Sequence, residues 1–242
     1  MAVEKKTLTQ LSVPICLETL LYMLSGMVDT LMLSSVSDQA VGAVGTANTY
    51  IGVFIIMFGV ISSGMVAVMS QNIGAGRLGI AYQARQLGLI FNASIGIVMS
   101  VILAFFSGGI LRIVSIAPAL LAPAETYLKI VGGACFLNAL IPIFSSYLRV
   151  FGYTKHSLIG TIAGNVINII LNSIFLFVFK WGVMGVAVAT VISRVVNLII
   201  VAVMGAVLIK AKKNPERIST RKILAQIVKI GFPSAFETAL YN

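Results

Sequence analysis

Two acidic residues, Glu18 and Asp29, lie inside the first long apolar stretch of the chain. On a helix their separation of eleven residues returns both carboxyl groups to within roughly 20° of the same direction. Tyr22 and Ser25 fall on the same line and complete a polar stripe. A carboxyl group at membrane depth is costly unless it faces protein or water, so the stripe indicates a functional surface. The alternative is that each carboxylate lies near a membrane interface, since each is within about two turns of one end of the stretch.

A later apolar stretch contains Asn165, Asn168 and Asn172, of which the last two are four residues apart and share a helix face. Amide oxygens are good ligands for a hard cation and good partners for a carboxyl group. They also join helices to one another inside membranes, which is the alternative interpretation. The following stretch adds Thr190 and, one turn later, Arg194, for which the sequence identifies no partner.

Other kinds of chemistry have little support. The chain has one histidine, His156, and its two cysteines, Cys16 and Cys135, lie in separate apolar stretches. A membrane-embedded enzyme would need a nucleophile–base pair or a set of metal ligands at membrane depth. No nucleotide-binding P-loop motif occurs, so any transport would be driven by an ion gradient or by other subunits. We therefore expect no enzymatic activity, no bound metal other than a transported ion, and no resident cofactor.

The elements that carry these residues are predicted to be membrane helices. Hydrophobic residues make up 59% of the chain and charged residues 10%, whereas a soluble domain has roughly 25% charged residues. The apolar stretches are about 20 residues or longer, which is the length that a helix needs to cross a bilayer. The net charge of +10 comes from basic residues between these stretches. Such residues face lipid headgroups, so nucleic acid is not expected as a partner.

The chain is predicted to be an all-α membrane protein with six transmembrane helices. These are expected at about residues 10–34, 44–70, 80–108, 123–149, 157–179 and 184–209. Pro142 is expected to bend the fourth helix and could act as a hinge. The candidates for substrate contact or gating are Glu18, Tyr22, Arg194 and Pro142.

Basic residues predict the orientation. Those at the N-terminus and in every second loop are Lys5, Lys6, Arg77, Arg85, Arg149, Lys155, Lys210, Lys212, Lys213, Arg217, Arg221, Lys222 and Lys229. The intervening loops contain only Arg112, Lys129 and Lys180. Because positively charged loops stay in the cytoplasm, the N-terminus and the linker at 210–222 are predicted to be cytoplasmic.

An internal repeat indicates a larger architecture. The segment that begins at Pro14 and the segment that begins at Pro233 match in Pro, Glu, Thr, Leu and Tyr at identical spacing. Six spans separate the two copies, so both would enter the membrane from the same side, as in transporters built from parallel repeats. We expect residues 1–209 to form an N-terminal six-helix lobe and 210–222 an interlobe linker. Residues 223–242 would begin the first helix of a C-terminal lobe in a twelve-helix, pseudo-twofold transporter. The alternative is a complete small protein with a frayed seventh helix.

Several segments together resemble the multidrug and toxic compound extrusion (MATE) family of transporters. They are the first helix with Pro14, Glu18, Thr19 and Asp29, the loop segments Ser70–Gly76 and Leu148–Lys155, and the start of the sixth helix, Gly182–Ser193. The resemblance implies a twelve-helix antiporter in a bacterial or archaeal cytoplasmic membrane. Such a protein exports organic cations or amphiphilic drugs in exchange for protons or sodium.

The family resemblance also implies a cation-coupling site formed by Asp29, Asn168, Asn172 and Thr190. Asn172 departs from the family pattern, which often has an aspartate at that position. The missing negative charge puts sodium coordination in doubt and favours proton coupling through Asp29. A flippase for lipid-linked sugars is the alternative within the same superfamily, but its cavity would be expected to carry several basic residues. In this sequence only Arg194 lies clearly within a span.

Overall fold

The computed structural model describes residues 7–113, 116–209 and 218–241, which form helices joined by short turns. These are α1 (Leu8–Ser34), α2 (Asp38–Gly74), α3 (Leu78–Ile113), α4 (Pro118–Tyr127), η1 (Leu128–Gly132), α5 (Cys135–Val150), α6 (Thr154–Ser173), η2 (Ile174–Val178), α7 (Gly182–Leu208) and α8 (Thr220–Tyr241). The segments η1 and η2 are short stretches of π-helix. Lys5, Lys6 and most of the expected linker lie outside the described residues.

The six predicted membrane spans are confirmed. Five described helices are long and apolar enough to cross a bilayer, and the bent pair Pro118–Gly132 and Cys135–Val150 makes a sixth. The helices α2 and α3 have 37 and 36 residues, which corresponds to about 55 Å of helix. This exceeds a hydrocarbon core of roughly 30 Å, so both extend beyond it or cross it at a tilt.

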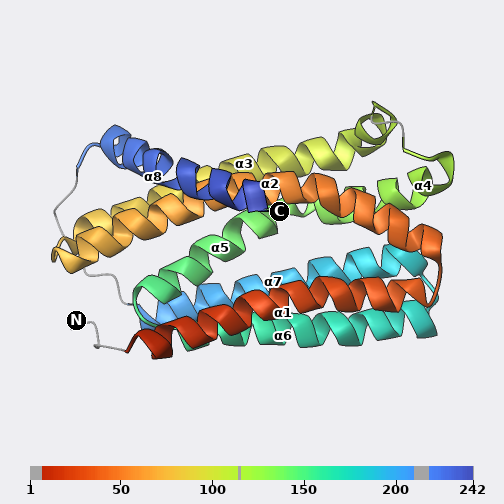
Figure 1. Ribbon diagram of the computed structural model, residues 1–242, viewed down its shortest axis with the longest axis horizontal. Helices are drawn as coiled ribbons and strands as arrows, with labels where there is room; N and C mark the ends of the chain where they lie inside the picture. The colour runs from red at the N-terminus through yellow and green to blue at the C-terminus, as the bar shows by residue number, and fades with distance from the viewer. Residues whose placement is uncertain (1–6, 114–115, 210–217, 242) are drawn as a thin grey trace.

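The turns between the helices are set by local chemistry. Ser37 caps α2, because its Oγ accepts a hydrogen bond from the backbone N–H of Ala40 at 3.4 Å. Gly76 and Gly152 end α2 and α5 with φ angles of 76° and 84°. Such angles are left-handed, a region that glycine enters without the steric penalty of a Cβ atom. The turn between α2 and α3 and the turn between α5 and α6 lie at the same end of the bundle as the start of α1 and the start of α8 (Figure 1).

The fourth span is bent at a different place from the one expected. Its two halves meet at 43°, and the break lies at Gly133 and Ala134. Pro142 lies about two turns further along, inside the continuous helix α5. The expectation that Pro142 makes the bend is therefore wrong. The π-helical turn η1 and the two adjacent glycines, Gly132 and Gly133, provide the break instead.

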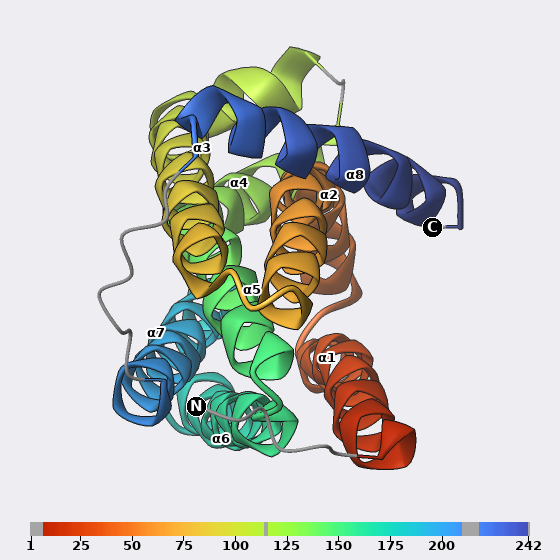
Figure 2. The same cartoon turned by 90° about the vertical axis from the view of Figure 1, so that its left-hand side faces the viewer.

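The helices form two groups with α5 passing obliquely between them (Figure 1). On one side, α1, α6 and α7 run side by side. On the other, α2 and α3 pack together, and α8 crosses over them (Figure 2). The largest buried apolar clusters lie among α2, α3, α4, η1, α5 and α7. Helix α1 contributes only Pro14, Glu18 and Leu33 to the buried residues.

The crossing of α8 over α2 depends on two glycines. A Cβ atom on Gly64 would collide with the carbonyl oxygen of Ile227, and one on Gly231 would collide with that of Val60. The two backbones therefore lie in close contact, as at other small-residue contacts inside membranes.

Gly64→Ala is expected to weaken the packing of α8 on α2, because the added methyl group meets rigid backbone. In a heating series in detergent, the Gly64→Ala protein should lose its monodisperse fraction at a temperature several degrees lower than the wild type does. Gly59→Ala is the matched control, since a Cβ atom at Gly59 meets nothing within 4 Å. This control should match or exceed the wild type, because alanine favours a helix by about 0.5–1 kcal/mol over glycine. Equal loss in both variants would contradict the close crossing.

Candidate functional site

A cavity of about 530 Å³ lies between the two groups of helices. Its wall is formed by residues of α1, α2, α4, α5, α6 and α7. Glu18, Tyr22, Ser25 and Asp29 all line it, so the polar stripe of α1 faces the cavity along its length. The volume falls in the range of roughly 300–1,000 Å³ that is common for sites of drug-sized ligands.

Asp29 is held by an amide from the neighbouring helix. The Nδ2 group of Asn172 donates a hydrogen bond to Asp29 Oδ1 at 2.6 Å and a weaker one to Asn168 Oδ1 at 3.3 Å. Asn172 is 0% exposed and its Oδ1 has no hydrogen-bond donor. The structure thus brings together Asp29, Asn168 and Asn172 as the sequence predicts. The donor orientation of the Asn172 amide suits a carboxylate form of Asp29.

Thr190 lies on the same wall but makes a different contact. Its Oγ1 donates to the carbonyl oxygen of Val186, one turn earlier, at 2.8 Å. No hydrogen bond joins Thr190 to Asp29, Asn168 or Asn172 in the described structure. Thr190 instead lies beside the phenol group of Tyr127, a buried residue of α4 that the sequence analysis did not single out.

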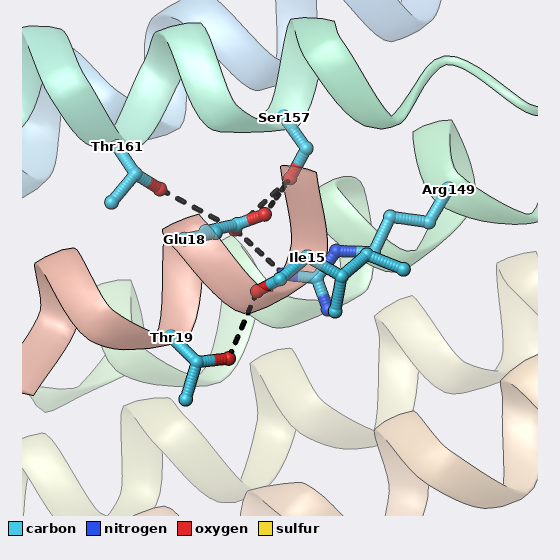
Figure 3. Close-up of polar contacts among 6 residues, drawn as sticks. All are labelled: Ile15, Glu18, Thr19, Arg149, Ser157 and Thr161. Atoms are coloured by element: carbon cyan, nitrogen blue, oxygen red, sulfur yellow. Dashed lines mark hydrogen bonds and ion pairs between the residues drawn. The ribbon is translucent and has the colours of Figure 1, made fainter. Parts of the chain in front are cut away.

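Glu18 lies in a cluster of its own near the other end of the stripe (Figure 3). Arg149 Nη2 is 2.6 Å from Glu18 Oε1. Ser157 Oγ lies 3.0 Å from both carboxylate oxygens, and Thr161 Oγ1 donates to Oε1 at 3.3 Å. Glu18 is 8% exposed, so it is buried in the lobe rather than placed in a hydrated loop. The sequence had assigned Arg149 to a charged loop, and its ion pair with Glu18 was not foreseen.

Polar contacts join α1 to α6 along most of their length. Asn165 Nδ2 donates to the carbonyl oxygen of Leu21 at 2.9 Å, between the Glu18 and Asp29 contacts. Thr154 Oγ1 reaches the carbonyl oxygen of Gln10 at 3.5 Å near the start of both helices. The apolar side chains of α1 mostly point outward, and Leu31, for example, is 70% exposed. Hydrogen bonds and one ion pair therefore hold α1 to the lobe.

The other candidates also reach the cavity wall. Tyr22 lines it while 60% exposed, and Pro142 lines it from α5. Arg194 lines it from α7, and its Nη1 atom is buried without a hydrogen-bond partner. Two polar residues that the sequence analysis did not select, Asn48 and Asn138, also face the cavity. The sequence contained a signal for both residues, because an amide side chain inside an apolar stretch needs a polar environment.

Known proteins resemble this chain in sequence and in fold. The family model MatE matches residues 14–174. The chain belongs to the MATE family. It is 36% identical to the uncharacterized transporter YisQ of Bacillus subtilis, over 98% of this chain and 53% of that protein. It is 29% identical to the probable multidrug resistance protein NorM of Thermotoga maritima, over 98% and 52% respectively. The chain thus spans about half the length of the curated relatives it matches.

Solved MATE structures share the fold. A MATE crystal structure in the bent conformation superposes with a TM-score of 0.85 at 21% identity, covering 96% of this chain and 52% of that one. An outward-facing multidrug resistance MATE transporter gives a TM-score of 0.84 at 21% identity, covering 94% and 51%. The six spans of this chain thus correspond in arrangement to half of a MATE transporter.

The Glu18–Arg149 pair can be tested by a double-mutant cycle. Arg149→Met leaves a buried carboxylate without its cation, and we expect it to lower the free energy of unfolding by about 1–3 kcal/mol. This is less than for a fully buried pair, since the Arg149 side chain is 31% exposed. The double variant Glu18→Gln, Arg149→Met removes the orphaned charge and should recover part of that loss. Heat stability in detergent is measured for the wild type, for each single variant, Glu18→Gln and Arg149→Met, and for the double variant. Additive losses would show that the two side chains do not interact.

Proposed function

We propose that the chain supplies one lobe of a secondary antiporter, which exports organic cations or amphiphilic drugs in exchange for protons or sodium. The observation that carries the proposal is the Asp29 carboxylate on the wall of a drug-sized cavity, bonded to Asn172 of a different helix. A second lobe of the same transporter, the bilayer and the exported compound are the expected partners. The proposal also places the protein in a cytoplasmic membrane with its N-terminus in the cytoplasm. Its activity would be transport and not an enzymatic reaction.

The coupling step acts through the contact between Asp29 and Asn172. The carboxylate form of Asp29 needs a donor, which the Asn172 amide nitrogen supplies at 2.6 Å. A protonated carboxyl group donates instead, and it would bond an amide oxygen. The unpaired Oδ1 of Asn172 is that acceptor once the amide turns over. Proton uptake therefore exchanges one arrangement of α1 on α6 for another, as a two-state transport cycle requires.

Protons suit this site better than sodium. A sodium ion needs several oxygen ligands directed at one point, whereas the Asn172 nitrogen faces Asp29 and the Thr190 hydroxyl donates to its own helix. Asp29 is the only carboxylate among these residues. Proton exchange through Asp29 is therefore the coupling reaction that we favour.

Asp29→Asn is expected to abolish gradient-driven export, because an asparagine cannot take up or release a proton in the physiological range. The measurement uses vesicles that contain the complete gene product and a fluorescent cationic dye, with a proton or a sodium gradient imposed separately. The wild type should export the dye under the proton gradient. Undiminished proton-driven export by Asp29→Asn would refute the role of this residue. If the wild type moves no cationic dye under either gradient, the flippase alternative becomes the better supported function. Lipid-linked sugars would then be the next substrates to test.

Asn172→Asp is expected to make export depend on sodium. The new carboxylate would lie where the amide now contacts Asp29, and two adjacent carboxylates repel unless a cation or a proton lies between them. Sodium should then stimulate export several-fold in vesicles at neutral pH. Asn165→Asp is the matched control, since Asn165 lies on the same helix and faces the same cavity but contacts the Leu21 carbonyl oxygen. Equal sodium responses in both variants would argue against a specific cation site at Asp29.

A further inference from the structure

A basic side chain of α3, Arg85, lies outside the cavity and is held by aromatic rings of α5. Its guanidinium carbon is 4.3 Å from the ring centroid of Tyr147 and 5.6 Å from that of Phe144. None of these three residues lines the cavity, whose wall on α5 is formed by other residues, such as Ser145 and Arg149. A cation over aromatic rings at these distances is stabilised electrostatically, so the rings hold Arg85 in place.

The aromatic residues beside Arg85 belong to the packing of three helices. Phe151 packs edge-on against Tyr147 at 5.3 Å between ring centroids, and it stacks with Tyr82 of α3 at 6.0 Å. Tyr147 also contacts α7, because a Cβ atom on Gly205 would lie 3.4 Å from its ring. Helix α5 lies between α3 and α7 at this end of the bundle (Figure 2). The guanidinium group is therefore attached to packed helices and not to a loop.

The charge of Arg85 has no partner among the described residues. The ion pairs found there join Lys129 to Glu125 and Arg149 to Glu18. The Nε atom of Arg85 is buried without a hydrogen bond, whereas its two Nη atoms are not closed off and bond to no described residue. Ring stacking covers the flat faces of a guanidinium group and leaves the N–H donors at its edge. The Nη edge of Arg85 is thus available to the oxygen atoms of an anion.

The depth of Arg85 in the membrane indicates which anion this is. Arg85 lies about two turns after the start of α3 at Leu78, or about 10 Å along the helix axis. The next charged residue of α3 is Arg112, so about 40 Å of helix separates the two charges. This exceeds a hydrocarbon core of roughly 30 Å, so Arg85 lies near the boundary between hydrocarbon and headgroups. Arginine side chains near helix ends extend toward this boundary, where the lipid phosphates lie.

Other basic residues lie at the same end of the bundle. Arg77 is exposed in the turn between α2 and α3, and Lys222 is exposed at the start of α8. Gln83 joins α3 to that start, because its amide donates to the Ile218 carbonyl oxygen at 2.9 Å and accepts from the Ile218 N–H at 3.2 Å. Groups of basic residues at a membrane surface attract anionic phospholipids. The charges at this end therefore favour an anionic lipid over a zwitterionic one.

We propose that Arg85 binds the phosphate group of an anionic phospholipid in the leaflet at this end of the bundle. The edge of the guanidinium group supplies two parallel hydrogen bonds to the phosphate oxygens, and the rings of Phe144 and Tyr147 fix its orientation. The bound lipid neutralises a charge that the described lobe leaves unmatched. The site is separate from the cavity, and the proposal does not depend on the proposed export function.

Loss of Arg85 is expected to weaken the binding of the first phosphatidylglycerol molecule. Native mass spectrometry measures the Kd, with phosphatidylglycerol added in steps to the delipidated complete gene product in detergent. Arg85→Gln should raise this Kd about tenfold, since hydrogen bonds to a charged group are lost. Arg85→Lys keeps the charge without the planar fork and should give an intermediate Kd.

Arg77→Gln is the matched control, because it removes the same charge at the same end of the bundle from an exposed turn. The buffer has an ionic strength of about 0.15 M or more, which screens exposed charges beyond about 8 Å. Arg77→Gln should therefore leave the Kd within about threefold of the wild type. Equal losses in Arg77→Gln and Arg85→Gln would show only a diffuse attraction to basic residues and would overturn the proposal.

Two further ligands test the unaltered protein. Diacylglycerol has the acyl chains of phosphatidylglycerol without the phosphate, and glycerol 3-phosphate has the phosphate without the chains. Phosphatidylglycerol should bind about tenfold more tightly than diacylglycerol, and glycerol 3-phosphate should not displace it. Equal binding of the two lipids would show that only the chains are recognised, which overturns the proposal. Displacement by glycerol 3-phosphate would assign a soluble phosphate to Arg85 and would overturn the lipid assignment.

A carboxylate of the linker is the alternative partner of Arg85. Glu216 lies outside the described residues, two positions before Ile218 in the sequence. We expect Glu216→Gln to bind phosphatidylglycerol as the wild type does. If the wild type instead shows no binding that depends on Arg85 and Glu216→Gln gains it, Glu216 is the partner and the proposal is overturned.

Discussion

The attachment of α1 to α6 through polar groups is the constraint on which this lobe depends. Lipid is as apolar as leucine, so apolar side chains supply no hydrophobic drive to bring two membrane helices together. Helix α1 turns most of its apolar side chains outward and contacts α6 through Glu18, Asp29 and backbone carbonyl groups. Two of these contacts involve carboxyl groups, whose hydrogen bonding changes with protonation. A change of charge on α1 is therefore also a change in what holds α1 in place.

The two carboxylates of the stripe differ in their surroundings, and this separates their roles. Glu18 has a cation and two hydroxyl groups around it, which hold its carboxyl group to α5 and α6. Asp29 has one uncharged hydrogen-bond donor, the Asn172 amide, and borders the cavity. Glu18 accordingly anchors the start of α1, while Asp29 is the group to which we assign the proposed ion coupling.

The sequence predicted the spans and the polar stripe because both follow from spacing along one helix. The apolar lengths gave six spans, and the angle between Glu18 and Asp29 placed them on one face. Contacts between helices were harder to predict, since they depend on the rotation and depth of each helix in the bundle. For this reason the sequence assigned Arg149 to a charged loop, although it lies in α5 and forms an ion pair with Glu18. The bend near Gly133 was missed because Pro142 is the stronger signal in a sequence, whereas a π-turn has no residue signature of its own.

The two π-helical segments adjoin the site directly, and their position bears on how it can move. η1 begins one residue after Tyr127, and η2 begins two residues after Asn172. A π-turn holds its backbone hydrogen bonds in a wider, less regular pattern, and a helix can shift locally there without losing its packing elsewhere. Tyr127 and Asn172 each have regular α-helix before them in the chain and a π-turn shortly after them. Leu128 and Val131 of η1 belong to the buried apolar core, whereas η2 contributes only Leu176 to it, so η2 is the turn at which a shift next to Asn172 would disturb that core least.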